Sequence, residues 1–118
     1  MKRSHQPPLW ALFGAGGMLA ALVGWMLVFL TGIAAPLGIG VPPGFMSYAN
    51  TIAFARSLPG KAFLFLVVAL FLWHAAHRIH HSLHDLGVRT DRFTALACYG
   101  LAVLGSASAA ARLWVIGT

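Results

Sequence analysis

Three long apolar runs constrain the fold of this 118-residue chain more than any other feature. They extend over roughly residues 10–33, 60–84 and 93–116, and neither of the two acidic residues of the chain lies within them. The hydrocarbon core of a bilayer is about 30 Å thick, so a helix needs about 20 apolar residues to cross it. The sequence therefore predicts an all-α membrane protein with three transmembrane helices, forming a single membrane-anchor domain over residues 1–118.

The composition excludes most soluble alternatives. Hydrophobic residues make up 59% of the chain and charged residues only 8%, and a chain of this size cannot bury so much apolar surface in a water-soluble core. The net charge of +6 comes from cations scattered near the ends of the apolar runs, so we expect no nucleic-acid partner. The single cysteine, Cys98, has no partner for a disulfide and is interpreted as a helix-packing residue.

Turn-forming residues separate the first two runs. Pro36 and the glycines and prolines that follow it predict the end of the first helix. The linker that extends to Pro59 has an apolar centre at residues 48–55, which we expect to lie along the membrane interface. The third run carries one charge, Arg112, close enough to its end to reach the interface. Small residues recur at Gly16, Ala20 and Gly24, a spacing typical of close helix packing.

The distribution of cations predicts the orientation. Five cations lie on the N-terminal side of the three predicted helices: Lys2, Arg3, Arg78, Arg89 and Arg92. Three lie on the other side: Arg56, Lys61 and Arg112. Because cytoplasmic segments carry the excess of lysine and arginine, this count favours a cytoplasmic N-terminus. The histidine-rich end of the second helix then reaches the cytoplasmic face, together with Trp10 at the start of the first helix.

Residues 73–85 are the most informative segment, because ionisable groups at membrane depth are costly and usually functional. At about 100° per residue, one helical face collects six polar side chains: His74, His77, Arg78, His81, His84 and Asp85. His80 lies on the margin of this face. Such residues can simply anchor a helix end and contact a partner. However, histidine also titrates near neutral pH, so His77 could bind a quinone oxygen and pass protons. The other residues of the segment could form a proton path or a partner contact.

Two other functions compete with quinone binding. A haem held by two histidines is one, and His74 is the best ligand here, but the second imidazole must come from another subunit because all histidines at membrane depth lie on one predicted helix. A small transporter or channel is the other, although only Asp85 accompanies the histidines. No activated nucleophile, paired carboxylates or phosphate loop is recognisable, so we expect the chain to be catalytically inert by itself and to hold no metal.

Several motifs along nearly the whole chain are similar to one family. They are Trp10-Ala-Leu-Phe-Gly14-Ala-Gly-Gly17-Met18, Ser47-Tyr48, Phe54-Ala55 with Ser57, Phe63-Leu-Phe-Leu66, Leu72-Trp73 and His77-Arg78-x-His80-His81-x-x-His84-Asp85-Leu86. The multi-histidine block is the most specific of these. On these motifs the chain resembles the D subunit of quinol:fumarate reductase, a membrane anchor. His74 departs from the pattern expected for the family, and the part from Arg89 onward matches only in hydrophobic character.

The resemblance implies a cell inner membrane protein of anaerobic respiration and electron transport. It implies three partners, the A, B and C subunits of fumarate reductase: a flavoprotein with FAD, an iron–sulfur protein and a second membrane anchor. It also implies that Trp10 and His77 line a site where menaquinol is oxidised, and that no haem is present. The alternatives stay open at this stage: a haem b anchor of a succinate dehydrogenase-type complex, or a small transporter or channel.

Overall fold

The structure is a computed structural model that describes residues 6–117. These residues form helices and turns without any strand, and three of the helices are long and apolar enough to cross a membrane: Trp10–Leu37, Leu58–Asp85 and Arg92–Val115. The prediction of an all-α membrane protein with three spanning helices is confirmed. The N-terminal cations Lys2 and Arg3, which entered the orientation argument, lie outside the described residues.

The first spanning helix is continuous but not uniform. Three α-helical segments, α1 (Gln6–Leu19), α2 (Trp25–Phe29) and α3 (Ala35–Leu37), alternate with two short π-helical segments. The π-helical segments are η1 (Ala20–Gly24) and η2 (Leu30–Ala34). The helix ends among the residues predicted to end it, at Gly38, whose φ of 65° is left-handed. It extends a few residues beyond the approximate bound at 33 and includes Pro36. A π-helical segment ends two residues before this proline, and such local widening is one way in which a helix accommodates a residue that cannot donate a backbone hydrogen bond.

The linker contains a helix that the sequence did not specify. Helix α4 (Tyr48–Arg56) begins after Ser47, whose side chain accepts a hydrogen bond from the Asn50 N–H at 3.3 Å. Ser57 both ends α4 and begins α5 (Leu58–Asp85), because its hydroxyl donates to the Phe54 carbonyl at 2.7 Å and accepts from the Gly60 N–H at 3.1 Å. These caps fix a sharp turn between α4 and α5.

The last spanning helix, α6 (Arg92–Val115), also begins at a side-chain cap. The Asp91 carboxylate accepts hydrogen bonds from the backbone N–H groups of Phe93 and Thr94, each at 3.1 Å. Hydrogen bonds from Thr94 lower the pKa of the Asp91 carboxyl from its ordinary value of 3.8. A negative charge at this position also complements the helix dipole, so Asp91 defines where α6 starts.

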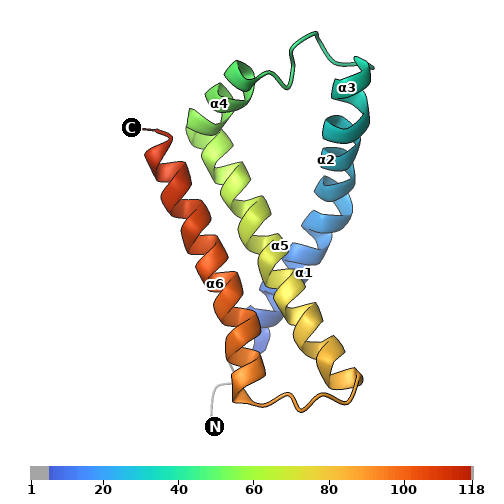
Figure 1. Cartoon of the computed structure of the whole chain (residues 1–118), viewed down its shortest axis with the longest axis vertical. Coiled ribbons are helices and arrows are strands. Elements are labelled where there is room, and N and C mark those ends of the chain that lie inside the picture. The colour runs from blue at the N-terminus through green and yellow to red at the C-terminus, as the bar shows by residue number, and fades with distance from the viewer. Residues whose placement is uncertain (1–5, 118) are drawn as a thin grey trace.

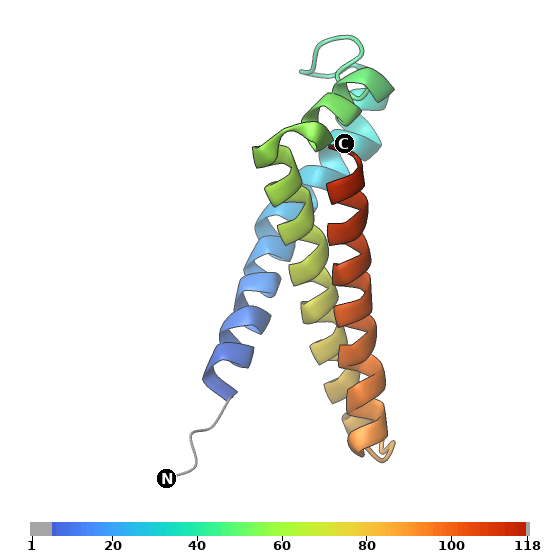
Figure 2. The same cartoon turned by 90° about the vertical axis from the view of Figure 1, so that its left-hand side faces the viewer.

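Helix α1 crosses α5 near the middle of α5, where Gly16 lies against Leu70 (Figure 1). The histidine end contains the start of α1, the end of α5 and the start of α6, whereas the opposite end contains α3, α4, the start of α5 and the end of α6 (Figures 1 and 2). Helix α6 lies beside α5 in both views, while α2 and α3 diverge from α5 after α1 has crossed it. The molecule is 55 Å long, which exceeds the hydrocarbon thickness of a bilayer.

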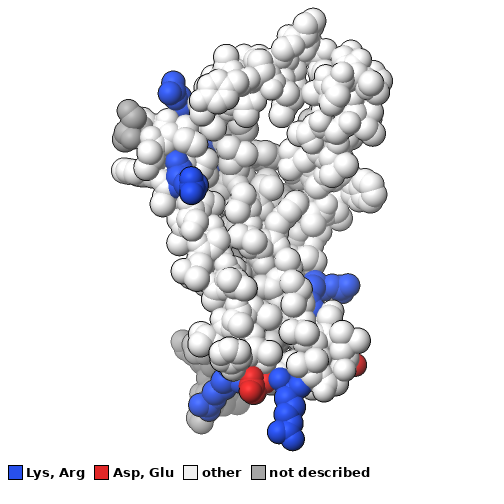
Figure 3. Space-filling view, in the orientation of Figure 1, with Lys and Arg blue, Asp and Glu red and all other residues white. Residues whose placement is uncertain are grey.

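Most large apolar side chains are uncovered. The buried hydrophobic residues among those described are all alanines, at positions 34, 55, 76 and 102, whereas Trp25 is 75% exposed and Leu22 is 71% exposed. Charged side chains gather toward the two ends of the face in Figure 3, and most of the surface between them is uncharged. Such a surface fits lipid and neighbouring membrane helices rather than water.

Candidate functional site

The length of α5 determines how deep its histidines lie. Its 28 residues correspond to about 42 Å at 1.5 Å per residue, which exceeds the roughly 30 Å of a hydrocarbon core. A core centred on α5 would leave the turn with His84 and Asp85 outside and would include His74 and His77. Helix length alone therefore places His74 and His77 within the hydrocarbon core and His84 and Asp85 outside it.

His74 is held against α1. Its Nδ1 lies 3.2 Å from the carbonyl oxygen of Phe13, and because a carbonyl only accepts, Nδ1 carries the proton and donates. The His74 and Phe13 rings are stacked, with centroids 4.7 Å apart and an interplanar angle of 8°. Glycine at positions 16 and 17 makes this approach possible, since a Cβ on Gly16 would lie 2.9 Å from the Cβ of His74, and one on Gly17 would lie 3.1 Å from its Cε1.

His77 lies where the three spanning helices meet. Its Nδ1 is 2.9 Å from the hydroxyl of Tyr99 on α6. The ring of Phe13 on α1 lies at a centroid distance of 4.4 Å from His77, and the His81 ring on α5 lies at 4.4 Å as well. With Nδ1 occupied by Tyr99, Nε2 is the nitrogen of His77 that remains for a further ligand.

His80 contacts the same tyrosine, although the sequence placed it only on the margin of the polar face. Its ring centroid lies 5.7 Å from that of Tyr99 and 5.8 Å from that of His81. The Nδ1 atom of His80 is the one buried side-chain nitrogen or oxygen without a hydrogen-bond partner within residues 6–117. A buried polar atom of this kind requires a partner from a neighbouring molecule or water.

Trp10 and His77 both contact the ring of Phe13. The indole contacts the Phe13 ring edge-on at a centroid distance of 5.8 Å, and Phe13 in turn contacts His77. Trp10 is 66% exposed, so most of its surface is open to a ligand. The two residues for which the resemblance implied a quinone site thus both contact Phe13, at the same end of the molecule.

The remaining polar residues of the α5 face extend outward. His84 makes a 3.0 Å hydrogen bond through Nδ1 to the hydroxyl of Thr90, which ties the end of α5 to the loop before α6. Arg78, His81 and Asp85 are exposed. No group of three or more His, Cys, Asp or Glu side chains suited to a metal ion occurs in the described part of the chain.

Two residues of this cluster were not predicted. Phe13 was quoted within the N-terminal motif but given no role, and Tyr99 lies in the third helix, from which no functional residue was taken. A tyrosine within an apolar run is a usable signal, because a buried phenolic hydroxyl needs a hydrogen-bond partner. Helical periodicity on α5 cannot reveal which neighbouring helix supplies that partner.

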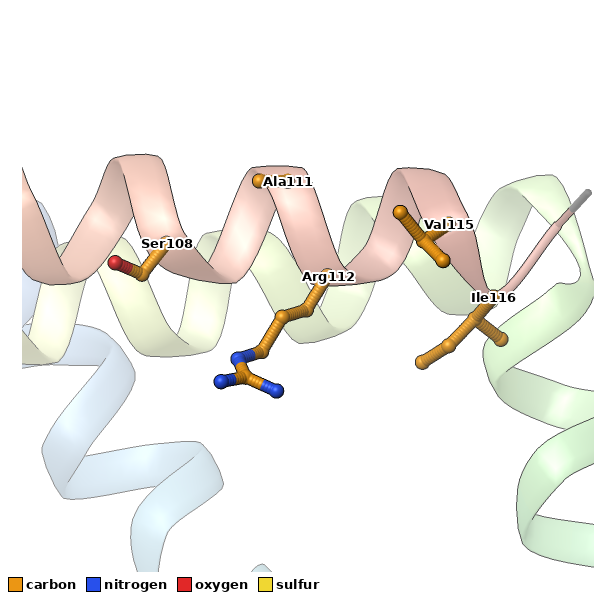
Figure 4. Close-up of a pocket in the computed structure, with 5 residues that line it drawn as sticks. All are labelled: Ser108, Ala111, Arg112, Val115 and Ile116. Carbon is orange, nitrogen blue, oxygen red and sulfur yellow. The ribbon is translucent and has the colours of Figure 1, made fainter.

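A separate hollow lies at the opposite end of the molecule. It has a volume of about 550 Å³ and is lined by Ser108, Ala111, Arg112 and Val115 on the last turns of α6 and by Ile116 directly after it (Figure 4). The Arg112 side chain extends away from α6 in this view. The hollow shares no residue with the contacts around His77 and Tyr99, so it is not part of the same site.

Comparisons with known proteins agree on one family. A model of the fumarate reductase D subunit family matches residues 1–114. The fumarate reductase D subunit of Vibrio cholerae serotype O1 (strain M66-2) is 42% identical over 115 residues, which cover 98% of this chain and 88% of that relative. The corresponding protein of Vibrio vulnificus (strain YJ016) is 39% identical over 115 residues, covering 98% of this chain and 91% of the relative. That of Shewanella sp. (strain W3-18-1) is 42% identical over 116 residues, covering 98% and 93% respectively.

Proposed function

This chain belongs to the fumarate reductase D subunit family and is a membrane anchor of a fumarate reductase complex, and we propose that its histidine end forms part of the site where menaquinol is oxidised. The observation that carries this proposal is the position of His77. Its ring is held by Tyr99 on α6 and Phe13 on α1, and only Nε2 remains for a ligand. A histidine fixed in this way is suited to bind a quinone oxygen and to accept its proton.

Trp10 supplies the second contact in this proposal. Its ring is exposed and packs edge-on against Phe13, which also contacts His77. An indole N–H donates one hydrogen bond, and the apolar rings of Trp10 and Phe13 are suited to the flat, apolar body of a naphthoquinone ring. The two residues could therefore hold a quinol head group from α1 while His77 contacts its oxygen from α5.

The proposal also specifies the surroundings of the chain. Its partners are the A, B and C subunits, namely a flavoprotein with FAD, an iron–sulfur protein and a second anchor, together in the cell inner membrane and acting in anaerobic respiration. The N-terminus is cytoplasmic, so the histidine end faces the iron–sulfur protein. The cations Arg78, Arg89 and Arg92 near this end support that orientation. The uncovered apolar surface of the spanning helices supports packing against the second anchor and lipid.

The chemical role of the chain follows from His77. Menaquinol supplies two electrons and two protons when it is oxidised, and the electrons pass to an iron–sulfur cluster in the partner protein. Neutral His77 accepts the two protons one after the other at Nε2 and passes each to water, and Trp10 orients the head group. This chain thus binds the substrate and holds a proton, whereas the redox groups lie in its partners.

The test is menaquinol:fumarate activity of the detergent-purified complex with His77→Ala. We expect quinol oxidation to fall by about 100-fold or more, because loss of a positioned acid–base group typically costs at least that factor. Fumarate reduction by an artificial dye, which enters through the flavoprotein or the iron–sulfur protein, should remain at the wild-type rate. Unchanged quinol oxidation, or purification of the chain without any flavoprotein, would contradict the proposal.

We further propose that His74 packs helices and ligates no haem. Helix α1 lies directly over this residue, with Phe13 stacked on the imidazole and Gly16 and Gly17 against it. A Cβ on Gly17 would lie 3.1 Å from Cε1 and 4.0 Å from Nε2 of His74, so α1 leaves little room for a porphyrin on that side of the ring. An absorption spectrum of the purified complex checks this point, since a Soret band from stoichiometric haem that disappears in His74→Ala would contradict it and favour a haem b anchor.

A further inference from the structure

The Tyr99 hydroxyl is the closest polar contact of His77, at 2.9 Å from Nδ1, and it comes from a different helix. We propose that Tyr99 is a positioning residue for menaquinol oxidation, whose hydroxyl fixes the ring of His77 and follows its change of protonation. This inference rests on the proposed role of His77 in the quinol step. It assigns a role to α6, the helix whose sequence motifs indicated none.

The geometry leaves little freedom to either ring. His77 is flanked by Phe13 on α1 and His81 on α5, each with a ring centroid 4.4 Å away. The Tyr99 ring is itself held between Trp73 at 5.4 Å and His80 at 5.7 Å. Because both rings are restrained, the hydroxyl stays at Nδ1 and the Nε2 edge of His77 stays directed away from it. Rigid support of this kind is what a proton-accepting group requires.

The hydroxyl of tyrosine can both donate and accept a hydrogen bond, which suits both protonation states of His77. When neutral His77 carries its proton on Nδ1, that N–H donates to the Tyr99 oxygen and Nε2 presents a lone pair to the quinol. As one quinol O–H bond breaks and an N–H bond forms at Nε2, one electron would leave toward the iron–sulfur protein. Once His77 has released that proton to water, the second proton and the second electron would leave in the same way. The resulting imidazolium keeps its Nδ1–H on the Tyr99 oxygen. A hydrogen bond from a charged donor is stronger than one from a neutral donor, so Tyr99 stabilises the charged state most.

No charged side chain competes for this position within the described residues. The titratable neighbours of His77 are His74, His80 and His81 on α5 and Tyr99 on α6, with Arg78 and Cys98 adjoining them in the sequence. Helix α1 contributes only uncharged rings, from Trp10 and Phe13. Carboxylates often orient catalytic histidines, but both acidic residues of the chain, Asp85 and Asp91, lie beyond this cluster. The neutral hydroxyl of Tyr99 therefore takes the orienting position.

The test is Tyr99→Phe in the intact complex, which removes one oxygen and keeps the ring that packs against Trp73. We expect kcat for menaquinol oxidation to fall about tenfold while KM changes little, because the hydroxyl supports proton transfer rather than binding. The acidic limb of the pH–rate profile should move to lower pH, since His77 is harder to protonate without an acceptor for its Nδ1–H. Dye-driven fumarate reduction should be unchanged.

Tyr48→Phe is the matched control. Tyr48 is the other tyrosine of the chain, is 83% exposed on α4 and lies at the opposite end. The same atom is removed, so a wild-type rate and pH profile are expected there. A loss of quinol oxidation in Tyr48→Phe equal to that in Tyr99→Phe would overturn the inference, because the effect would not depend on the contact with His77.

A double variant separates this inference from the proposed function. If Tyr99 acts through His77, then His77→Ala with Tyr99→Phe should be no slower than His77→Ala alone. A wild-type kcat and pH profile for Tyr99→Phe, alongside loss of activity in His77→Ala, would overturn the role of Tyr99 and leave that of His77 intact. A further tenfold loss in the double variant would show that Tyr99 acts independently, which also overturns it. Full quinol oxidation in His77→Ala would instead contradict the proposed function itself.

Discussion

The two ends of this molecule differ in how the three spanning helices contact one another. At the histidine end, side chains from α1, α5 and α6 meet in direct polar and ring contacts centred on His77 and Tyr99. At the opposite end, α2 and α3 diverge from α5 (Figure 1), and large side chains such as Trp25 and Leu37 are exposed. Large apolar side chains are exposed at both ends, including Trp10 and Phe93 at the histidine end, so the difference lies in the polar and ring contacts that hold His77.

This contrast indicates where a membrane anchor can keep polar groups. His74 and His77 are tolerable near the hydrocarbon core because the Phe13 carbonyl and the Tyr99 hydroxyl each bond one of their nitrogens. Glycine at position 16 allows α1 to come close enough to provide the carbonyl. The opposite end carries no comparable polar cluster on its spanning helices among the described residues, and its helices can separate without leaving such groups unpaired. The polar side chains His74 and His77 therefore lie where α1 packs closely against α5.

Among variants that probe the two ends, Gly16→Val should have the strongest effect. A Cβ at this position would lie 2.5 Å from the Leu70 carbonyl oxygen on α5, and a backbone atom cannot move aside cheaply. Overpacking of this kind typically costs about 1–3 kcal/mol, so assembled complex should fall severalfold and its thermal stability should drop. The remaining complex should oxidise menaquinol poorly, because α1 carries Phe13 and Trp10 away from His77.

Gly14→Val is the control for that prediction. A Cβ at Gly14 meets nothing within 4 Å, and the residue lies on the same helix. The yield of complex, measured on a native gel, should stay near wild type. An equal loss of assembled complex in the two variants would show that the α1–α5 contact is not the cause. Normal assembly of Gly16→Val would show that the close approach of α1 to α5 at Gly16 is not required.

A smaller effect is expected from Ser57→Ala at the opposite end. Ser57 caps the start of α5 and also donates to the Phe54 carbonyl at 2.7 Å. Loss of an N-cap typically costs about 1 kcal/mol, so the melting temperature of the complex should fall by a few degrees. Menaquinol oxidation should keep its wild-type kcat, because the histidine end is built independently. Ser108→Ala, an exposed serine within α6, should change neither quantity. A matching loss of kcat in Ser57→Ala would mean that the two ends are coupled.

The weakest effect is expected from Asp91→Ala, and it should depend on pH. Hydrogen bonds from Thr94 lower the pKa of this carboxyl from 3.8 in the folded chain, so its contribution to stability is present above that value and is lost as the pH falls through the lowered one. Amide hydrogen exchange in the first turn of α6 should therefore be faster in the variant at neutral pH. The difference should shrink in strong acid, and a difference that is independent of pH would contradict the capping role.

The sequence was sufficient for the main architecture, because apolar runs of membrane-spanning length leave few alternatives. The end of the first helix was predicted only approximately, at about residue 33 before Pro36 and the glycines that follow it. The helix includes Pro36 and continues to Leu37, and the left-handed Gly38, one of those glycines, provides the stop. Helix α4 was expected only as an apolar interfacial segment. Its start and end depend on the side-chain hydrogen bonds of Ser47 and Ser57, which residue types suggest but do not specify.

The candidate site was only partly predictable. Periodicity correctly grouped His74 and His77 on one face of α5, and both contact Phe13. It could not identify Tyr99, because the pairing of helices depends on tertiary packing that a single helix does not encode. For the same reason His80 was placed on the margin, although its ring lies 5.7 Å from Tyr99. The functional roles of all these residues remain predictions.

Photoaffinity labelling of the intact complex can locate the quinol site, which we propose to lie at the histidine end of this chain. A light-activated azidoquinone is cross-linked, and the labelled peptides are identified by mass spectrometry. We expect label on the first turns of α1 or on residues 74–81 of α5, and we expect excess menaquinone to suppress it. Label confined to α2, α3 and α4, or found only in the other subunits, would contradict the proposal.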